Sequence, residues 1–219
     1  MSSLRISILG AGDIGGTLGR KWAKAGHRVA FGVKDPSSEK AQSLRQDLGE
    51  DILIGSPTEA LTQSDVVLLA VPGSAVNELI TTHAQLLDHK TIIDATNQIV
   101  KGKTTATNTW QGQGTLNSLG TLQAHAPHAR LYRAFNSYAW EEFADPVFQG
   151  VQADLFYCGP QGDALAIVEQ LIAEIGLRPV RLGDVDQVEV VDEILRLWAS
   201  LALFQGLGRD KVAFKMLTR

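Results

Sequence analysis

The chain has 219 residues, of which 44% are hydrophobic and 20% are charged, and its formal net charge is −4. This size and composition suit a globular protein with one large core, or a nucleotide-binding domain with a small appendage. The net negative charge argues against nucleic acid as a partner, because nucleic acid binds to basic surfaces. The single cysteine, Cys158, excludes an intrachain disulfide and any metal centre built from several cysteines.

Neither membrane insertion nor secretion is indicated by the sequence. No apolar run approaches the roughly 20 residues that a membrane-spanning helix needs. The first predicted strand begins by Leu4, so nothing at the start resembles a signal peptide. We therefore expect a cytoplasmic protein whose partners are small molecules rather than nucleic acid or membrane.

A glycine-rich turn follows the first predicted strand and opens a helix predicted over residues 14–25. Gly10, Gly12 and Gly15 form the pattern G-x-G-x-x-G, which is typical of dinucleotide-binding folds. Gly10 would permit the turn, Gly12 the approach of a pyrophosphate, and Gly15 close packing of helix on strand. The residues expected to hold the pyrophosphate are Gly10, Ala11, Gly12, Asp13, Ile14 and Gly15.

The end of the second predicted strand, residues 28–32, is where such domains distinguish NAD from NADP. The strand end carries no acid. Lys34 is placed to meet a 2′-phosphate, and Ser37 can donate a hydrogen bond to it. NADP is therefore favoured, although Asp35 would read the ribose of NAD if the register shifted by one residue. If Lys34 does not bind a phosphate, it is a solvated lysine in a loop.

The rest of the chain alternates between strands and helices, which predicts a doubly wound, Rossmann-type α/β fold with a mostly parallel sheet. Further strands are predicted at residues 52–55, 65–71, 91–97, 130–136, 153–159 and 178–183. Helices are predicted at residues 39–48, from 56 onward, and at 76–87, 116–124, 164–175 and 185–204, with a closing strand or helix at 211–217.

Small or polar residues follow several of these strands, at the edge where ligands bind in open α/β sheets. Val71, Pro72, Asn97 and Asn136 are expected to border the nicotinamide, although Asn136 fits equally a role in capping the following turn. The polar segment 101–114 is predicted to be a mobile loop over the site.

The five histidines include no pair with a carboxylate at helical spacing, so no metal site is expected. No catalytic side chain is assigned either. Tyr138, after the sixth strand, is the best-placed proton donor if the reaction needs one.

Several segments together carry a resemblance that extends over essentially the whole chain. They are residues 10–15, Gly32-Val33-Lys34, Arg133-Ala134-Phe135-Asn136, Tyr157-Cys158-Gly159, and the tail from Phe204-Gln205-Gly206-Leu207-Gly208 to Phe214-Lys215. On these residues the chain resembles the NADPH-dependent reductases of the deazaflavin coenzyme F420 and related dinucleotide-binding oxidoreductases. That family holds NADPH with the glycine loop and a Ser-Arg or Thr-Arg pair. Here Val33-Lys34 keeps the cation.

The resemblance implies an NADPH-dependent oxidoreductase that transfers hydride between NADP(H) and a flavin-like acceptor, either deazaflavin or flavin. Residues 1–150 would form the nucleotide-binding domain. Residues 151–219 would complete the acceptor site and, through the apolar helix 185–204, form a homodimer. Two alternatives remain: an imine or carbonyl reductase, and a sensor that binds NADP(H) without turnover.

Overall fold

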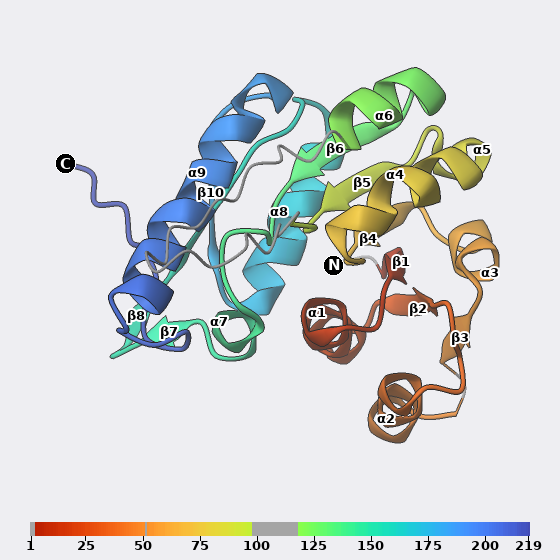
Figure 1. Ribbon diagram of the computed structural model, residues 1–219, viewed down its shortest axis with the longest axis horizontal. Helices are drawn as coiled ribbons and strands as arrows, with labels where there is room; N and C mark the ends of the chain where they lie inside the picture. The colour runs from red at the N-terminus through yellow and green to blue at the C-terminus, as the bar shows by residue number, and fades with distance from the viewer. Residues whose placement is uncertain (1–2, 51, 98–117) are drawn as a thin grey trace, which may run out of the picture.

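A six-stranded parallel sheet forms the centre of the computed structural model, which describes residues 3–50, 52–97 and 118–219 (Figure 1). The strand order is β3-β2-β1-β4-β5-β6. The bounds are β1 Arg5–Leu9, β2 Arg28–Gly32, β3 Leu53–Gly55, β4 Val66–Leu69, β5 Thr91–Asp94 and β6 Arg130–Arg133. The order reverses between β1 and β4, which is the topological switch point of a Rossmann fold. The predicted fold class is confirmed.

Helices cover both faces of this sheet, because successive side chains along its strands belong to two apolar cores on opposite faces. In β4, Val66 and Leu68 belong to the core shared with α1, α2 and α8, whereas Val67 and Leu69 belong to the core beneath α3, α4, α5 and α6 (Figure 1). The helices are α1 Asp13–Lys24, α2 Glu39–Leu48, α3 Pro57–Thr62, α4 Gly73–Thr82, α5 Ala84–Leu87, α6 Ser118–His125, α7 Trp140–Ala144, α8 Asp163–Ile175 and α9 Val188–Ala199.

The C-terminal part is a smaller α/β unit in which β9 (Asp154–Tyr157) pairs in parallel with β10 (Arg178–Arg181). An isolated bridge between Arg133 and Cys158 joins it to the main sheet. The core beneath α1 continues into α8, and the indole of Trp22 donates a hydrogen bond to the carbonyl of Leu171 at 3.0 Å. The two parts therefore share one apolar core.

Some predicted elements were wrong in their limits. The helix expected at residues 76–87 already starts at Gly73, because Pro72 fixes its own φ near the helical value and serves as N-cap. It is divided at His83 into α4 and α5. The long helix expected at 185–204 is a 3-10 turn (Val185–Gln187), α9 and a π turn (Ser200–Phe204).

Other predictions failed outright or are untested. Residues 211–217 contain neither the strand nor the helix expected there; they run alongside β9, where the amide of Asp154 donates to the carbonyl of Phe214. Helix α7 and the hairpin of β7 (Val147–Phe148) and β8 (Val151–Gln152) were not predicted. The loop expected at residues 101–114 lies outside the described residues. None of the helices described is long and apolar enough to cross a bilayer.

Candidate functional site

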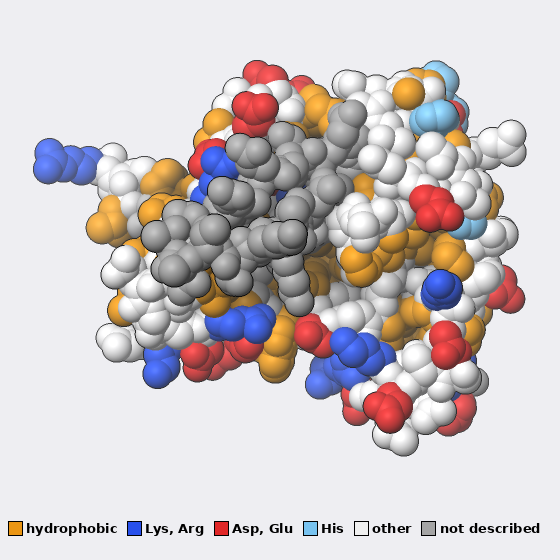
Figure 2. Space-filling model, viewed as in Figure 1, with side chains coloured by type: hydrophobic (Ala, Val, Ile, Leu, Met, Phe, Trp, Pro, Cys, Tyr) orange, Lys and Arg blue, Asp and Glu red, His pale blue; other side chains and the backbone are white. Residues whose placement is uncertain are grey.

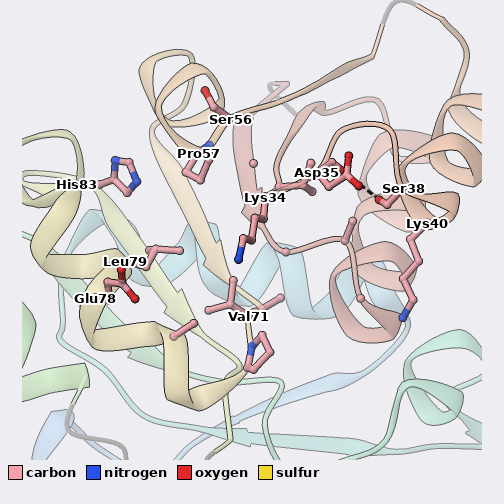
Figure 3. A pocket seen from close by; sticks show the side chains of 18 of the residues that line it. Lys34, Asp35, Ser38, Lys40, Ser56, Pro57, Val71, Glu78, Leu79 and His83 are labelled. Carbon is pink, nitrogen blue, oxygen red and sulfur yellow. Dashed lines mark hydrogen bonds between the residues drawn. The ribbon is translucent and has the colours of Figure 1, made fainter.

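A cleft of about 670 Å³ opens at the carboxyl ends of β1, β2 and β4, next to the switch point of the sheet. Its walls come from the glycine loop, the β2–α2 connection, the start of α3, the end of β4 and one face of α4 (Figure 3). The lining residues are Gly10, Ala11, Gly12, Gly32, Val33, Lys34, Asp35, Ser38, Lys40, Ser56, Pro57, Ala70, Val71, Pro72, Ala75, Glu78, Leu79, Thr82 and His83.

The three glycines of the loop face different surroundings. A Cβ at Gly10, whose φ is +112°, would lie 2.5 Å from the carbonyl oxygen of Ala70. A Cβ at Gly15 would lie 2.2 Å from the carbonyl oxygen of Gly10. Gly12 has an ordinary φ of −71°, and a Cβ there would meet nothing within 4 Å. The fold itself therefore requires Gly10 and Gly15, whereas the missing side chain of Gly12 leaves open space at the cleft wall.

Helix α1 begins at this loop without a side-chain cap on its first turn. By contrast, α3 starts nearby with a complete capping box, in which the hydroxyl of Ser56 accepts from the amide of Glu59 at 3.3 Å and the Glu59 carboxylate accepts from the amide of Ser56 at 2.7 Å. The amides at the start of a helix have no intrahelical partners and carry the positive end of its dipole. The start of α1 is accordingly suited to bind an anion.

The end of β2 brings one cation into the cleft. Lys34 is exposed and extends into the cleft from the end of the strand (Figure 3). No carboxylate within the described ranges forms an ion pair with it. Lys40, also on the wall, is paired with Asp13 at 3.0 Å. Lys34 is therefore available to a phosphate.

Asp35 also lines the cleft, but its carboxylate is engaged in its own turn. The Oδ1 atom accepts hydrogen bonds from the amide and the hydroxyl of Ser37 at 2.8 and 2.6 Å, and these bonds lower the pKa of Asp35. Ser37 is thus turned toward Asp35 and is absent from the cleft lining, where Ser38 stands instead. The hydroxyl of Ser38 donates to the carbonyl of Asp35 at 2.8 Å.

The α4 side of the cleft was missed by sequence reasoning. Ala75, Glu78, Leu79, Thr82 and His83 form this wall because α4 starts directly after β4. Burial lowers the pKa of His83, so its imidazole is neutral near neutral pH. Ala75, Glu78, Leu79 and Thr82 are spaced at i, i+3, i+4 and i+7, which would have identified this face of the helix once its start was placed at Gly73.

Asn97 and Asn136 lie together, but not on the cleft wall. The Asn97 amide donates to the carbonyl of Asn136 at 2.8 Å, and the Asn136 amide donates to Asp192 of α9 at 3.0 Å. Arg133 donates to Asn97 at 3.2 Å and pairs with Asp192 at 2.8 Å. Asn136 is fully buried, and its Oδ1 atom has no hydrogen-bond partner among the residues described.

The remaining predicted site residues surround the start of α1. Asp13 lines a second hollow of about 420 Å³ on the other side of the loop, where Trp140 also stands. Ile14 and Gly15 form the first turn of α1. The structure thus brings Gly10, Ala11, Gly12, Lys34, Val71 and Pro72 into one cleft, and leaves Ser37, Asn97 and Asn136 outside its lining.

Comparison with known proteins agrees with this geometry. Residues 5–98 match the family described as NADP oxidoreductase, coenzyme F420-dependent. The resemblance seen in the sequence is confirmed over this part, which contains the glycine loop and all of the residues that line the cleft. A glycerol-3-phosphate dehydrogenase [NAD(P)+] of Pseudomonas fluorescens is 30% identical over 106 residues, which are 43% of this chain and 30% of that protein. The match thus spans less than a third of that relative.

Solved structures extend the likeness of fold to the whole chain. A proposed F420-dependent NADP reductase from Arthrobacter sp. FB24 has a TM-score of 0.80 and 22% identity, with 99% of this chain and 100% of that chain covered. A hypothetical protein of Sinorhizobium meliloti has a TM-score of 0.66 and 26% identity, with 100% and 97% covered. A reductive aminase from Aspergillus terreus, in complex with NADPH, has a TM-score of 0.67 and 21% identity, with 94% and 64% covered.

Proposed function

We propose that the chain is an NADP(H)-dependent oxidoreductase that transfers hydride between the nicotinamide and a flavin-like acceptor. The observation that carries the proposal is Gly12, whose open side stands at the uncapped start of α1 on the wall of the cleft. Nothing in the described part of the chain requires a glycine there. A pyrophosphate that approaches the backbone explains the missing side chain, and the amides at the start of α1 are placed to bind it.

The preference for NADP(H) over NAD(H) rests on the end of β2. Lys34 supplies a cation to the 2′-phosphate as a point charge. The Asp35 carboxylate is occupied by Ser37, which supports a role in the turn rather than in reading the ribose. Ser38 lines the cleft and Ser37, the serine suggested by sequence, does not, so a phosphate at Lys34 would take the hydroxyl proton that Ser38 donates to the carbonyl of Asp35.

A flavin-like acceptor is favoured over an imine or carbonyl substrate by the state of Tyr138. Its hydroxyl donates to the carbonyl of Asp154 at 2.8 Å and accepts from the amide of Phe214 at 3.1 Å, and the residue is 4% exposed. It is therefore committed to the fold and unavailable as a proton donor. Hydride transfer between two rings needs juxtaposition and exclusion of water more than acid catalysis.

Oxidation of NADPH in the presence of different acceptors tests this function. The loss of NADPH absorbance is followed with a deazaflavin, with a flavin and with a cyclic imine, on the wild-type chain and on Gly12→Ala. We expect turnover with a deazaflavin or flavin and none with the imine, and loss of turnover in Gly12→Ala. Turnover with the imine alone would make the chain an imine reductase. Tight NADPH binding without turnover on any acceptor would make it a sensor.

A further inference from the structure

Asp88, His89 and His128 gather at the edge of the sheet opposite the cleft. Asp88 and His89 come just before β5, and His128 comes just before β6, so all three stand where these parallel strands begin. Figure 2 shows histidine side chains at the upper right of the molecule, near the ends of α5 and α6 in Figure 1. None of the three residues is among those that line the cleft.

The Asp88 carboxylate is held in place and presents one oxygen to both imidazoles. Its Oδ1 atom accepts from the backbone amide of His128 at 2.8 Å. Its Oδ2 atom lies 3.0 Å from Nδ1 of His128 and 3.5 Å from Nε2 of His89. In a tetrahedral site with bonds of about 2.0–2.1 Å, neighbouring ligand atoms are about 3.3 Å apart. Both distances are close to that spacing.

The backbone around the cluster is fixed, whereas the two rings are held only by their mutual stacking and by the hydrogen bond between His128 and Asp88. His89 has a positive φ of 62°, and Arg130 donates to its carbonyl at 3.2 Å. The imidazoles stack with centroids 4.5 Å apart and are 75% and 63% exposed. One ligand atom from each of the three residues lies within 4.8 Å of the others. Binding of an ion would turn these exposed rings, and bonds to the ion would replace their stacking and the hydrogen bond of His128 to Asp88.

We propose that Asp88, His89 and His128 bind one divalent cation of the Zn²⁺ class. Two imidazole nitrogens and a carboxylate oxygen are ligands suited to Zn²⁺, whereas Mg²⁺ and Ca²⁺ prefer oxygen alone. The fourth position of a tetrahedral ion is left to water. The ion ties the start of β5 to the start of β6.

The sequence shows no sign of this site, because no histidine stands at helical spacing from a carboxylate. Asp88 and His128 are 40 positions apart and meet only when β5 and β6 pair. This site is independent of the proposed nucleotide chemistry, because its residues do not line the cleft.

Calorimetric titration of the untagged chain with Zn²⁺ tests the proposal. We expect one ion per chain, with the affinity lowered at least about tenfold by His89→Asn and by His128→Asn. Asparagine is chosen at position 89 because it tolerates a positive φ. His125→Asn, at the exposed end of α6, is the matched control and should bind like wild type.

Three further readouts separate this site from adventitious binding. Zn²⁺ should raise the melting temperature of wild type and of His125→Asn, but not of His128→Asn. The affinity should fall as pH is lowered, because imidazole and carboxylate ligands bind an ion only without their protons. The affinity for NADPH should be unchanged in all variants. Absence of stoichiometric binding, or equal affinity in wild type and the two site variants, would overturn the proposal.

Discussion

Gly12 and Gly15 are two glycines of one loop that the structure constrains in different ways. A Cβ at Gly15 would lie 2.2 Å from the carbonyl oxygen of Gly10, which is backbone and has no room to move. A Cβ at Gly12 would meet only open space. The same substitution should therefore affect stability at one position and ligand binding at the other.

We expect Gly15→Ala to lower the free energy of unfolding by about 1–3 kcal/mol or more, as overpacking does. Gly12→Ala should leave that free energy within about 0.5 kcal/mol of wild type, but should weaken NADPH binding at least about tenfold, because its methyl group occupies the path of the pyrophosphate. Urea unfolding and an NADPH titration of both variants measure the two effects. If Gly12→Ala bound NADPH like wild type, the pyrophosphate would not lie against Gly12.

Glu142 is a buried carboxyl group whose protonation should make stability depend on pH. It is 1% exposed, one oxygen accepts from the indole of Trp198 at 3.0 Å, and the other has no partner in the described part of the chain. Burial raises its pKa to about 7. Below the pKa of an unfolded glutamate the carboxyl is neutral in both states. As pH rises through about 7 the buried group must ionise, and stability is lost.

Glu142→Gln removes this ionisation and keeps the acceptor for Trp198. We expect the variant to be more stable than wild type by about 3 kcal/mol at pH 8, and to differ little at pH 4, since a shift of one pKa unit is worth about 1.4 kcal/mol and the pKa rises from 4.5 to about 7. Urea unfolding at the two pH values gives the comparison. An advantage as large at pH 4 as at pH 8 would show that ionisation of Glu142 is not its cause.

At the scale of elements, Arg133 joins the exits of β5 and β6 to α9. Its guanidinium is 3% exposed and pairs with Asp94 at 3.2 Å and with Asp192 at 2.8 Å. Removal of one partner of a buried ion pair leaves an uncompensated charge and costs about 3–5 kcal/mol. Burial already raises the pKa of Asp192, so the loss of Arg133 should favour its protonated form.

Arg133→Met should therefore lower the free energy of unfolding by about 3–5 kcal/mol. Arg5→Met provides the control, because the Arg5–Asp65 pair at 2.8 Å is more than half exposed, and such pairs contribute at most about 1 kcal/mol. Chemical unfolding of both variants at one pH measures the difference. Equal losses of unfolding free energy in the two variants would mean that Arg133 does not stabilise the junction between the sheet and α9.

Elements with a strong local pattern were predictable from sequence, and those fixed by distant contacts were not. β2 and α2 have the predicted limits, because glycine and serine mark their boundaries. Helix α7 has only five residues and is set by its packing beneath α1, which no local pattern records. The place of Asn136 beside the nicotinamide stays a prediction, whereas its hydrogen bond to Asp192, 56 positions away, has no local signal in the sequence. The glycine loop was predictable because its whole motif lies within one short segment of the sequence.

At the scale of the whole molecule, α9 and the π turn after it expose an apolar stripe. Val190 and Leu197 are spaced by seven residues in α9 and are 46% and 50% exposed, and Leu203 in the π turn is 42% exposed. Positions seven apart lie on the same face of a helix. We propose that a second copy of the chain covers this stripe, which is the dimer expected from the sequence.

Light scattering after gel filtration should give a dimer for wild type and a monomer for Leu197→Glu, because a charge in an apolar interface is left without a partner. Val147→Glu is the matched control, since Val147 is also 50% exposed but lies in the β7–β8 hairpin. If the wild-type chain were a monomer at micromolar concentration, the proposal of a dimer would be wrong.

Titration of NADPH and NADH at fixed salt tests whether the cleft binds NADP(H) with Lys34 on the 2′-phosphate. Quenching of tryptophan fluorescence reports binding, since Trp140 stands beside the glycine loop. We expect NADPH to bind about tenfold more tightly than NADH, and Lys34→Ala to weaken NADPH by about that factor while NADH is unchanged. Lys24→Ala, an exposed lysine at the far end of α1, should change neither. Equal affinity for the two nucleotides in wild type, or a preference for NADH, would contradict the account and assign the ribose to Asp35.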